Sequence, residues 1–191
     1  GIRAADGTWM PIDDYVDAEF LSRFPQVFID GFTGLDGKLY SLQIGGWFPW
    51  AWVNTKLIQD AGATVPDTDW TWDAYLEAAG AVAQKSDDPL QTVWGSGAPW
   101  DTVHSAWAFG GDYFDEQGYI TGKPDKTIVN SPLSIEGWQF MQDLIYTHGF
   151  QPTPAEGEIL AAAGIDLFLS GKVGIAMSAN WNLGTYSEIE E

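Results

Sequence analysis

Apolar runs with the composition of β-strands alternate with longer segments of helical periodicity along this chain, and this alternation limits the fold more than any other feature. Several helical segments begin at a residue that caps helices well, such as Thr71 or Ser131. Helices are predicted over residues 13–24, 55–61, 72–85, 102–109, 131–148 and 156–169, and strands over residues 38–44, 50–53, 93–94 and 172–178. Strands that alternate with helices predict an α/β layer architecture.

Two segments interrupt this alternation. The glycine-rich run from Gly95 to Pro99 is predicted to be a flexible loop that leads into Trp100 and Asp101. Residues 112–126 are predicted to form a small polar excursion with turns. The sequence contains no internal repeat and no low-complexity tract, so a repeat architecture is not expected.

Tryptophan is unusually frequent, with 11 copies beside 10 phenylalanines and 7 tyrosines. One core rarely requires so many indole rings, and large flat rings also stack on the faces of sugars. The surplus therefore favours carbohydrate binding, while packing in the core is the alternative explanation. Since hydrophobic residues make up 45% of the chain, a disordered chain is not expected.

The charge balance is strongly acidic, because 27 Asp and Glu residues against 8 Lys and Arg give a net charge of −19. Binding to nucleic acid or to an anionic membrane requires clustered basic side chains, so both partners are disfavoured.

Cysteine is absent and the two histidines lie far apart, so neither a disulfide nor a metal or other cofactor is expected. No apolar run is long enough to insert into a membrane. An acidic protein of this kind fits an extracytoplasmic setting.

Seven short motifs follow one another in a characteristic order. They are Asp36-Gly37-Lys38, Val53-Asn54-Thr55-Lys56, Thr71-Trp72-Asp73, Phe109-Gly110-Gly111, Asn130-Ser131-Pro132, Gly171-Lys172-Val173 and Asn180-Trp181. In their order and spacing, the chain resembles the family 1 extracellular solute-binding proteins of bacterial ABC importers, which include the maltose-binding protein. The likeness covers residues 36–181, and the chain reads as the middle section of such a protein.

The resemblance implies an α/β periplasmic-binding-protein-like fold, a two-lobed clamp that holds its ligand in the cleft between the lobes. Residues 1–37 would be a remnant of the N-terminal lobe and residues 38–45 a strand that crosses between lobes. Residues 46–179 would form the body of the C-terminal lobe, and residues 180–191 would begin the return. The apolar side chains of the remnant, Tyr15, Phe20, Leu21 and Phe24, would then lack their normal cover.

The resemblance also implies a role. It indicates a protein that binds a sugar or oligosaccharide reversibly and is not an enzyme, with the permease subunits of an ABC importer as its partners. It implies an extracytoplasmic location, in the periplasm or as a cell-surface lipoprotein. A secretion signal or lipid anchor would then lie upstream of this chain.

Sugar recognition combines aromatic rings for the apolar face of the sugar with planar polar groups for its hydroxyls. The predicted ligand-binding residues are Gly46, Trp47, Trp50, Trp100, Asp101, Asn180 and Trp181. The resemblance supports Trp100, the nearest match to an aromatic residue that stacks on sugar in this loop of the maltose-binding protein. It also supports Trp181, because in the family a Trp at this spacing after the Gly-Lys-Val strand stacks on the ligand. Trp47 follows the expected crossing strand, at a position where maltose-type members carry an acidic residue, so maltose itself is not the expected ligand.

Two of these residues also have a structural explanation, namely Trp50 and Asp101. Trp50 and its neighbour Trp52 can pack in the core, and Asp101 can cap the helix that follows it.

The alternative function is a carbohydrate-active enzyme such as a glycosidase, which needs two carboxylates across the scissile bond, but no catalytic motif is recognisable. A lectin-like module is disfavoured by the predicted helices. No Lys or Arg occurs in the windows that hold the predicted ligand residues, and a neutral ligand is therefore expected; these windows are 45–54, 94–107 and 178–183.

Overall fold

The computed structural model describes residues 4, 6–43, 45–46, 48–97, 102–187 and 189. The chain divides into two compact units, each described here by itself: unit 1 comprises Gly1–Gly46 and Asp112–Asn130, and unit 2 comprises Trp47–Gly111 and Ser131–Glu191. The sequence placed residues 112–130 within the body of the C-terminal lobe, whereas the structure groups them with the first 46 residues. Within the described part of the chain, no helix is both long and apolar enough to cross a membrane.

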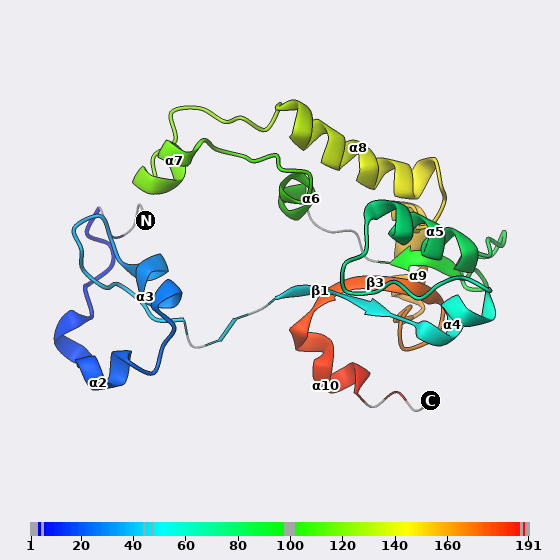
Figure 1. Cartoon of the computed structure of the whole chain (residues 1–191), viewed down its shortest axis with the longest axis horizontal. Helices are drawn as coiled ribbons and strands as arrows, with labels where there is room; N and C mark the ends of the chain where they lie inside the picture. Colours follow the sequence, from blue (N-terminus) through cyan, green and yellow to red (C-terminus); the bar gives the residue numbers. More distant parts are fainter. Residues whose placement is uncertain are drawn as a thin grey trace. The chain divides into compact units, whose positions relative to one another are not determined.

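Unit 2 is built on a three-stranded sheet of β1 (Pro49–Val53), β2 (Trp94–Gly97) and β3 (Val173–Ala179), with β3 in the centre (Figure 1). β1 runs antiparallel to β3, with Pro49 opposite Ala179, and β2 runs parallel to β3. The parallel pair requires a long crossover connection, which in this chain contains helices. The strands predicted at residues 50–53, 93–94 and 172–178 are thereby confirmed.

The helices of unit 2 are α4 (Thr55–Asp60), α5 (Trp72–Val82), α6 (Thr102–Ala108), α8 (Pro132–Tyr146), α9 (Pro154–Ala162) and α10 (Leu183–Tyr186), and the 3-10 helix η2 (Asn180–Asn182) precedes α10. Three of them begin at a hydroxyl side chain that accepts a hydrogen bond from the backbone N–H three residues further on, namely Thr71, Ser131 and Thr153. In α9, the Glu156 carboxylate also accepts the Thr153 N–H and completes a capping box.

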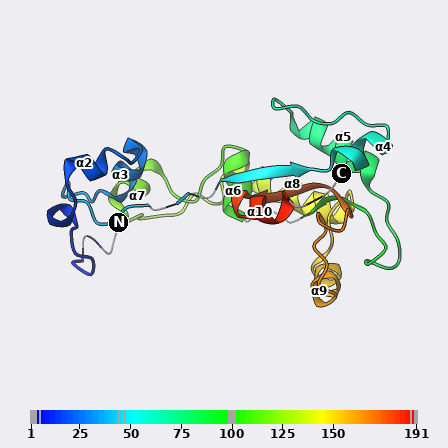
Figure 2. The ribbon, with the colours of Figure 1, turned by 90° about the horizontal axis from the view of Figure 1, so that it is seen from below.

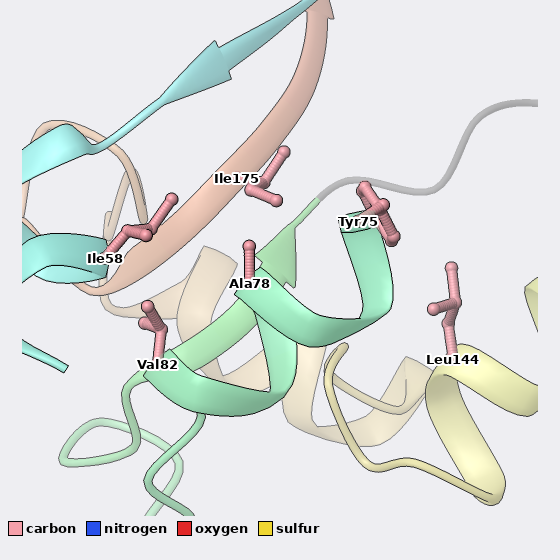
Figure 3. Close-up of a cluster of buried hydrophobic side chains, with 6 residues drawn as sticks. All are labelled: Ile58, Tyr75, Ala78, Val82, Leu144 and Ile175. Atoms are coloured by element: carbon pink, nitrogen blue, oxygen red, sulfur yellow. The ribbon is translucent and has the colours of Figure 1, made fainter. Parts of the chain in front are cut away.

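Two clusters of buried side chains cover the two faces of the sheet. Alternate residues of β1 belong to different clusters, since Ala51 and Val53 pack on the first and Trp52 packs on the second. The first cluster joins β3 to α4, α5 and α8 through Ile58, Tyr75, Ala78, Val82, Leu144 and Ile175 (Figure 3). The second consists of Trp94, Leu160, Val173 and Ala176. α5 and α9 accordingly lie on opposite sides of the strands (Figure 2).

Two predictions for unit 2 are corrected by its glycines. Gly95 to Gly97 belong to β2 and are buried, although the sequence predicted a flexible loop there. The cause is a close approach, because a Cβ on Gly95 would lie 2.3 Å from the carbonyl oxygen of Ala79 in α5. The helix predicted over residues 156–169 ends at Ala162, since Gly164 adopts a left-handed φ of 68° and turns the chain.

The elements in the described part of unit 1 are short, namely η1 (Asp13–Tyr15), α2 (Ala18–Leu21), α3 (Gln26–Phe32) and α7 (Glu116–Thr121). The helix predicted over residues 13–24 is broken, because two aspartates bind backbone groups instead. Asp17 accepts the Phe20 N–H and starts α2, while Asp13 accepts the N–H of Leu39. Among the described residues of the strand predicted over 38–44, only an isolated bridge from Leu39 to Thr33 is formed.

Candidate ligand-binding surface

Asn180 holds together the end of the sheet where β1 begins and β3 ends. Its side-chain oxygen accepts a hydrogen bond from the Phe48 N–H at 2.9 Å, and its own N–H donates to the Phe48 carbonyl oxygen at 3.3 Å. These bonds extend the pairing of Pro49 with Ala179 by one position. Asn182 adds a hydrogen bond of 2.9 Å from Nδ2 to Ser178 Oγ. The turn that follows β3 is therefore fixed to the sheet.

Three large aromatic side chains of this strand end are exposed to solvent. The exposed fraction is 63% for Trp181, 58% for Phe48 and 39% for Trp50, whereas Trp94 in β2 is completely buried. Exposed rings that gather on one part of a surface mark sites of interaction more often than isolated ones do. We call Phe48, Trp50 and Trp181, together with the Asn180 backbone junction, the aromatic surface.

The aromatic surface rests on further rings. Trp50 meets Trp52 edge to face, with the ring centroids 5.5 Å apart, and Trp52 meets Tyr186 of α10 at 4.9 Å. Burial raises the pKa of Tyr186 to about 12, and the carboxylate of Asp166, to which the Tyr186 hydroxyl donates at 3.2 Å, acts in the same direction. Tyr186 therefore stays a neutral phenol near pH 7, and its bond to Asp166 holds α10 in place.

A pocket on the side of the sheet that carries the first cluster is a second candidate site within unit 2. It has a volume of about 530 Å³, a size that suits a small ligand, and it is lined by Ala51, Trp70, Thr71, Trp72, Tyr75 and Met177. Ligand sites also need polar groups that orient the ligand. The Thr71 hydroxyl is already used to cap α5, at 3.3 Å from the Ala74 nitrogen. The other lining side chains are mainly apolar, although Trp70, Trp72 and Tyr75 each carry one polar group. We take the aromatic surface as the candidate for a sugar, because its large rings are exposed to solvent.

The structure brings together some of the predicted ligand residues and leaves others undescribed. Three of them lie at the same end of the sheet, Trp50 in β1 and Asn180 and Trp181 in the turn after β3. Those that lie outside the described residues are Trp47, Trp100 and Asp101. Gly46 falls in unit 1. Phe48 was missed by the sequence analysis, although its place in the aromatic run between Trp47 and Pro49 was a usable signal.

The chemistry that the aromatic surface offers is stacking rather than catalysis. Its rings present flat apolar faces, and the Asn180 amide lies beside them, where it positions Phe48. No Lys or Arg occurs in the sequence windows 45–54 and 178–183 that carry it. Across the described residues, no group of three or more His, Cys, Asp or Glu side chains is placed to hold a metal ion. The surface is suited to a ligand with an apolar ring face and no strong charge.

Residues 2–189 match the family of bacterial extracellular solute-binding proteins. The chain belongs to this family. The resemblance that the motifs indicated is thereby confirmed, and membership of a solute-binding family agrees with the expectation of a binding protein rather than an enzyme. The description of the family as extracellular agrees with the predicted location at this coarse level.

Relatives of this solute-binding protein are longer than the chain. An arabinooligosaccharide-binding protein of Halalkalibacterium halodurans is 24% identical over 181 residues, which cover 93% of this chain and 37% of that protein. An ABC substrate-binding protein of Listeria monocytogenes in complex with cycloalternan has a TM-score of 0.75 at 22% identity, covering 97% of this chain and 46% of that one. UgpB of Mycobacterium tuberculosis in complex with glycerophosphocholine has a TM-score of 0.68 at 18% identity, covering 96% and 45%. The chain thus spans less than half the length of each.

These likenesses confirm the α/β periplasmic-binding-protein-like fold. They do not select a ligand, because the two solved relatives share the fold with this chain at about 20% identity and hold chemically different ligands. The ligand of this solute-binding protein has to be argued from its own surface.

Proposed function

We propose that this protein is the solute-binding component of an ABC importer and that it reversibly binds a neutral sugar or oligosaccharide against the aromatic surface. In the clamp that the family resemblance implies, this surface is part of the wall that faces the ligand cleft. Trp181 stacks on the sugar, Trp50 and Phe48 extend the contact, and Asn180 keeps the strand end in place. Trp47, Trp100 and Asp101 are proposed to add contacts.

The observation that carries the proposal is the exposure of Trp181 on a fixed support. Its ring is 63% exposed, while the residues on either side of it are fixed by the hydrogen bond from the Phe48 N–H to the Asn180 side chain and by the one from Asn182 to Ser178. Exposing a large ring to water is unfavourable, so an ordered exposed ring is best explained by a ligand that covers it. A rigid aromatic anchor also loses little conformational entropy on binding.

The neutral character of the ligand follows from the charges around the surface. A phosphate or carboxylate ligand requires a guanidinium or ammonium group nearby, and the windows around the proposed contacts contain no Lys or Arg. The chain as a whole carries a net charge of −19, which disfavours an anion further. A neutral glycan, such as the arabinooligosaccharide in the name of the H. halodurans relative, fits these conditions better than a phosphodiester.

The partners and the location of the protein follow from the proposed role. A binding component of an importer works outside the cytoplasm and delivers its ligand to permease subunits. The permease contacts are proposed to lie outside the aromatic surface, because that surface has to hold the ligand until the protein docks.

The test is a thermal-shift screen of the full-length protein with neutral glycans, uronic acids and glycerophosphocholine. We expect neutral glycans to raise the melting temperature, since a ligand that binds the native state stabilises it by mass action. The glycans recovered from the mixture should be unchanged. A shift caused only by the charged ligands would contradict the proposed ligand class, and cleavage of a glycan would contradict the proposed role as a binding protein.

A further inference from the structure

The sheet of unit 2 has two edges, β1 and β2, on either side of β3 (Figure 1), and they are covered to different degrees. At the β2 edge, the Ser96 N–H donates to the carbonyl oxygen of Phe150 at 3.0 Å, and every residue of the strand is buried. In β1, the first two residues are exposed and the other three are half-buried. The β1 edge is therefore the more open one.

The hydrogen bonds at the two ends of β1 show which of its backbone groups point away from β3. The Asn54 N–H donates to the Gly174 carbonyl oxygen at 2.8 Å, and the Asn180 N–H donates to the Phe48 carbonyl oxygen at the other end. Bonded and non-bonded pairs alternate along an antiparallel ladder. The even-numbered residues of β1 therefore bond to β3, and the backbone groups of the odd-numbered residues point outward.

The odd-numbered residues of β1 are Pro49, Ala51 and Val53. Proline suits an outward position, because it has no N–H to leave unpaired. Within the described part of the chain, no residue on the outer side of β1 forms a backbone hydrogen bond with Ala51 or Val53. A sheet edge with unpaired N–H and C=O groups is a template for the pairing of another strand.

The pocket of about 530 Å³ lies beside the same edge. It is lined by Ala51 of β1, by Met177 of β3 and by residues between positions 70 and 75 at the start of α5. Ala51 thus contributes its side chain to the pocket and its backbone groups to the open edge. A strand added next to β1 would place alternate side chains on the face of the sheet that carries the first cluster, and one of them would enter the pocket.

We propose that the outer edge of β1 and this pocket are the docking site for a β-strand from the part of the full-length protein that lies outside this chain. The docked strand exchanges hydrogen bonds with Ala51 and Val53 and inserts an apolar side chain into the pocket. The site is separate from the aromatic surface, since Trp50 projects to the opposite face of the sheet, and it does not depend on the proposed ligand.

The choice of this occupant rests on chain length and on charge. The chain covers 37%, 46% and 45% of its three relatives, so a protein of their length has more than half of its residues available for the docking site. A second copy of this chain fits the edge less well. Each copy carries a net charge of −19, and Pro49 removes one donor from any pairing of β1 with itself.

Amide exchange resolved by residue tests the proposal, measured by NMR on the 191-residue protein and on the full-length protein. In the 191-residue protein, the amides of Ala51 and Val53 should exchange fast, and those of Trp50 and Trp52, which bond to β3, should exchange slowly. In the full-length protein, the Ala51 and Val53 amides should exchange at least about a hundredfold more slowly than in the 191-residue protein, because the docked strand pairs them.

Ala51→Leu tests the pocket, and Ala61→Leu is its matched control, because Ala61 is an exposed residue that follows α4. A leucine at position 51 occupies the space that the docked side chain requires. The melting temperature of the full-length protein should therefore fall by at least about 2 °C. In the 191-residue protein the pocket is open, and the melting temperature should hardly change. Ala61→Leu should have little effect on either protein.

Fast exchange of Ala51 and Val53 in the full-length protein would overturn the proposal, because the edge would be open there as well. Slow exchange of both amides in the 191-residue protein would also overturn it. Protection that disappears on dilution would show that a second copy covers the edge, and protection that persists would show that this chain covers it. Equal melting temperatures for the two full-length variants would show that no side chain enters the pocket. If Ala51→Leu fails to fold, the exchange rates of the unsubstituted proteins still decide the matter.

Discussion

Unit 1 and unit 2 both contain many apolar side chains, but they differ in how far these side chains are buried. Unit 2 buries two apolar clusters against its sheet, and Ile58, Trp94 and Ile175 have no exposed surface. In the described part of unit 1, Leu39 is the one hydrophobic side chain that is buried. Its other large apolar side chains are half-buried or exposed, with exposed fractions of 72% for Tyr15 and 69% for Val27. Apolar residues at helical spacing therefore do not make a core unless another element covers them.

The two units also differ in how their helices are supported. α5 and α8 of unit 2 pack on one another through Trp72 and Phe140, whose ring centroids are 4.8 Å apart. α2 and α3 of unit 1 span four and seven residues and contain no buried residue. Helices this short are marginal in water without tertiary packing. Unit 2 should thus behave as a folded domain in isolation, and unit 1 should not.

The largest expected difference concerns hydrogen exchange. Backbone amides of β3 should exchange at least about a thousandfold more slowly than those of α2 and α3, which corresponds to about 4 kcal/mol of opening free energy. The reason is that β3 is the central strand and most of its residues are buried. Exchange measured by mass spectrometry on the 191-residue protein checks this. Equal protection in the two units would show that unit 1 has a core of its own.

A smaller effect is expected from truncating single side chains. Ile175→Ala should lower the unfolding free energy by about 2–5 kcal/mol, because it leaves a cavity in the first cluster. Val27→Ala on the exposed side of α3 should change it by less than about 0.5 kcal/mol. Far-UV circular dichroism in urea reports the helices of both units and measures both changes, while tryptophan fluorescence follows unit 2 selectively, since Trp9 is the only tryptophan outside it. A large loss of stability in Val27→Ala would contradict the comparison.

The smallest of these effects concerns the ion pair at the start of α9. Burial pushes the pKa of Glu156 upward, but hydrogen bonds from Thr153 and the Lys85 ammonium, 3.2 Å away, outweigh it, so this pKa lies below its ordinary value. A depressed folded-state pKa stabilises the native state above the ordinary value of 4.5, and this contribution is lost as the pH falls through the depressed pKa.

Glu156→Gln should therefore lower the unfolding free energy by about 0.5–1 kcal/mol near pH 7. The difference between the two proteins should shrink as the pH falls below 4.5. Thermal melts of both proteins across this range measure the difference, and the general effect of the net charge cancels in the comparison. A difference that does not change with pH would show that the charge of Glu156 has no part in it.

The elements that the sequence predicts well are those whose signals are local. Thr71 and Ser131 cap the helices expected of them, and the apolar run of residues 172–178 forms the central strand. The loop prediction at Gly95 is wrong, because glycine-rich segments resemble loops in sequence. This glycine is instead required by the close approach of Ala79 in another element. The helix prediction that starts at Asp13 is wrong for a similar reason, because the Asp13 side chain accepts a hydrogen bond from the distant N–H of Leu39. Contacts between distant residues are not visible in local patterns.

The candidate site shows the same difference between local signals, which the sequence reveals, and contacts between distant residues, which it does not. Trp181 and Trp50 could be predicted from their residue type and from the order of the motifs. The role of Asn180 as a backbone clamp could not, because its partner Phe48 lies 132 positions away. A polar residue beside an aromatic one suggests ligand binding in the sequence, whereas the structure shows that it also joins two strands. Sequence patterns thus propose aromatic residues that the structure places at one end of the sheet, but they do not distinguish proposed contact residues from their supports.

The central claim is that the aromatic surface of unit 2 binds the sugar, and calorimetry of Trp181→Ala in the full-length protein tests it most directly. The account predicts that affinity falls by about 1–3 kcal/mol, the loss of one stacked ring, while the melting temperature without ligand changes little. Tyr146→Ala is the matched control, because this aromatic side chain at the end of α8 is 64% exposed and lies outside the surface. Unchanged affinity in Trp181→Ala, or an equal loss in Tyr146→Ala, would contradict the account.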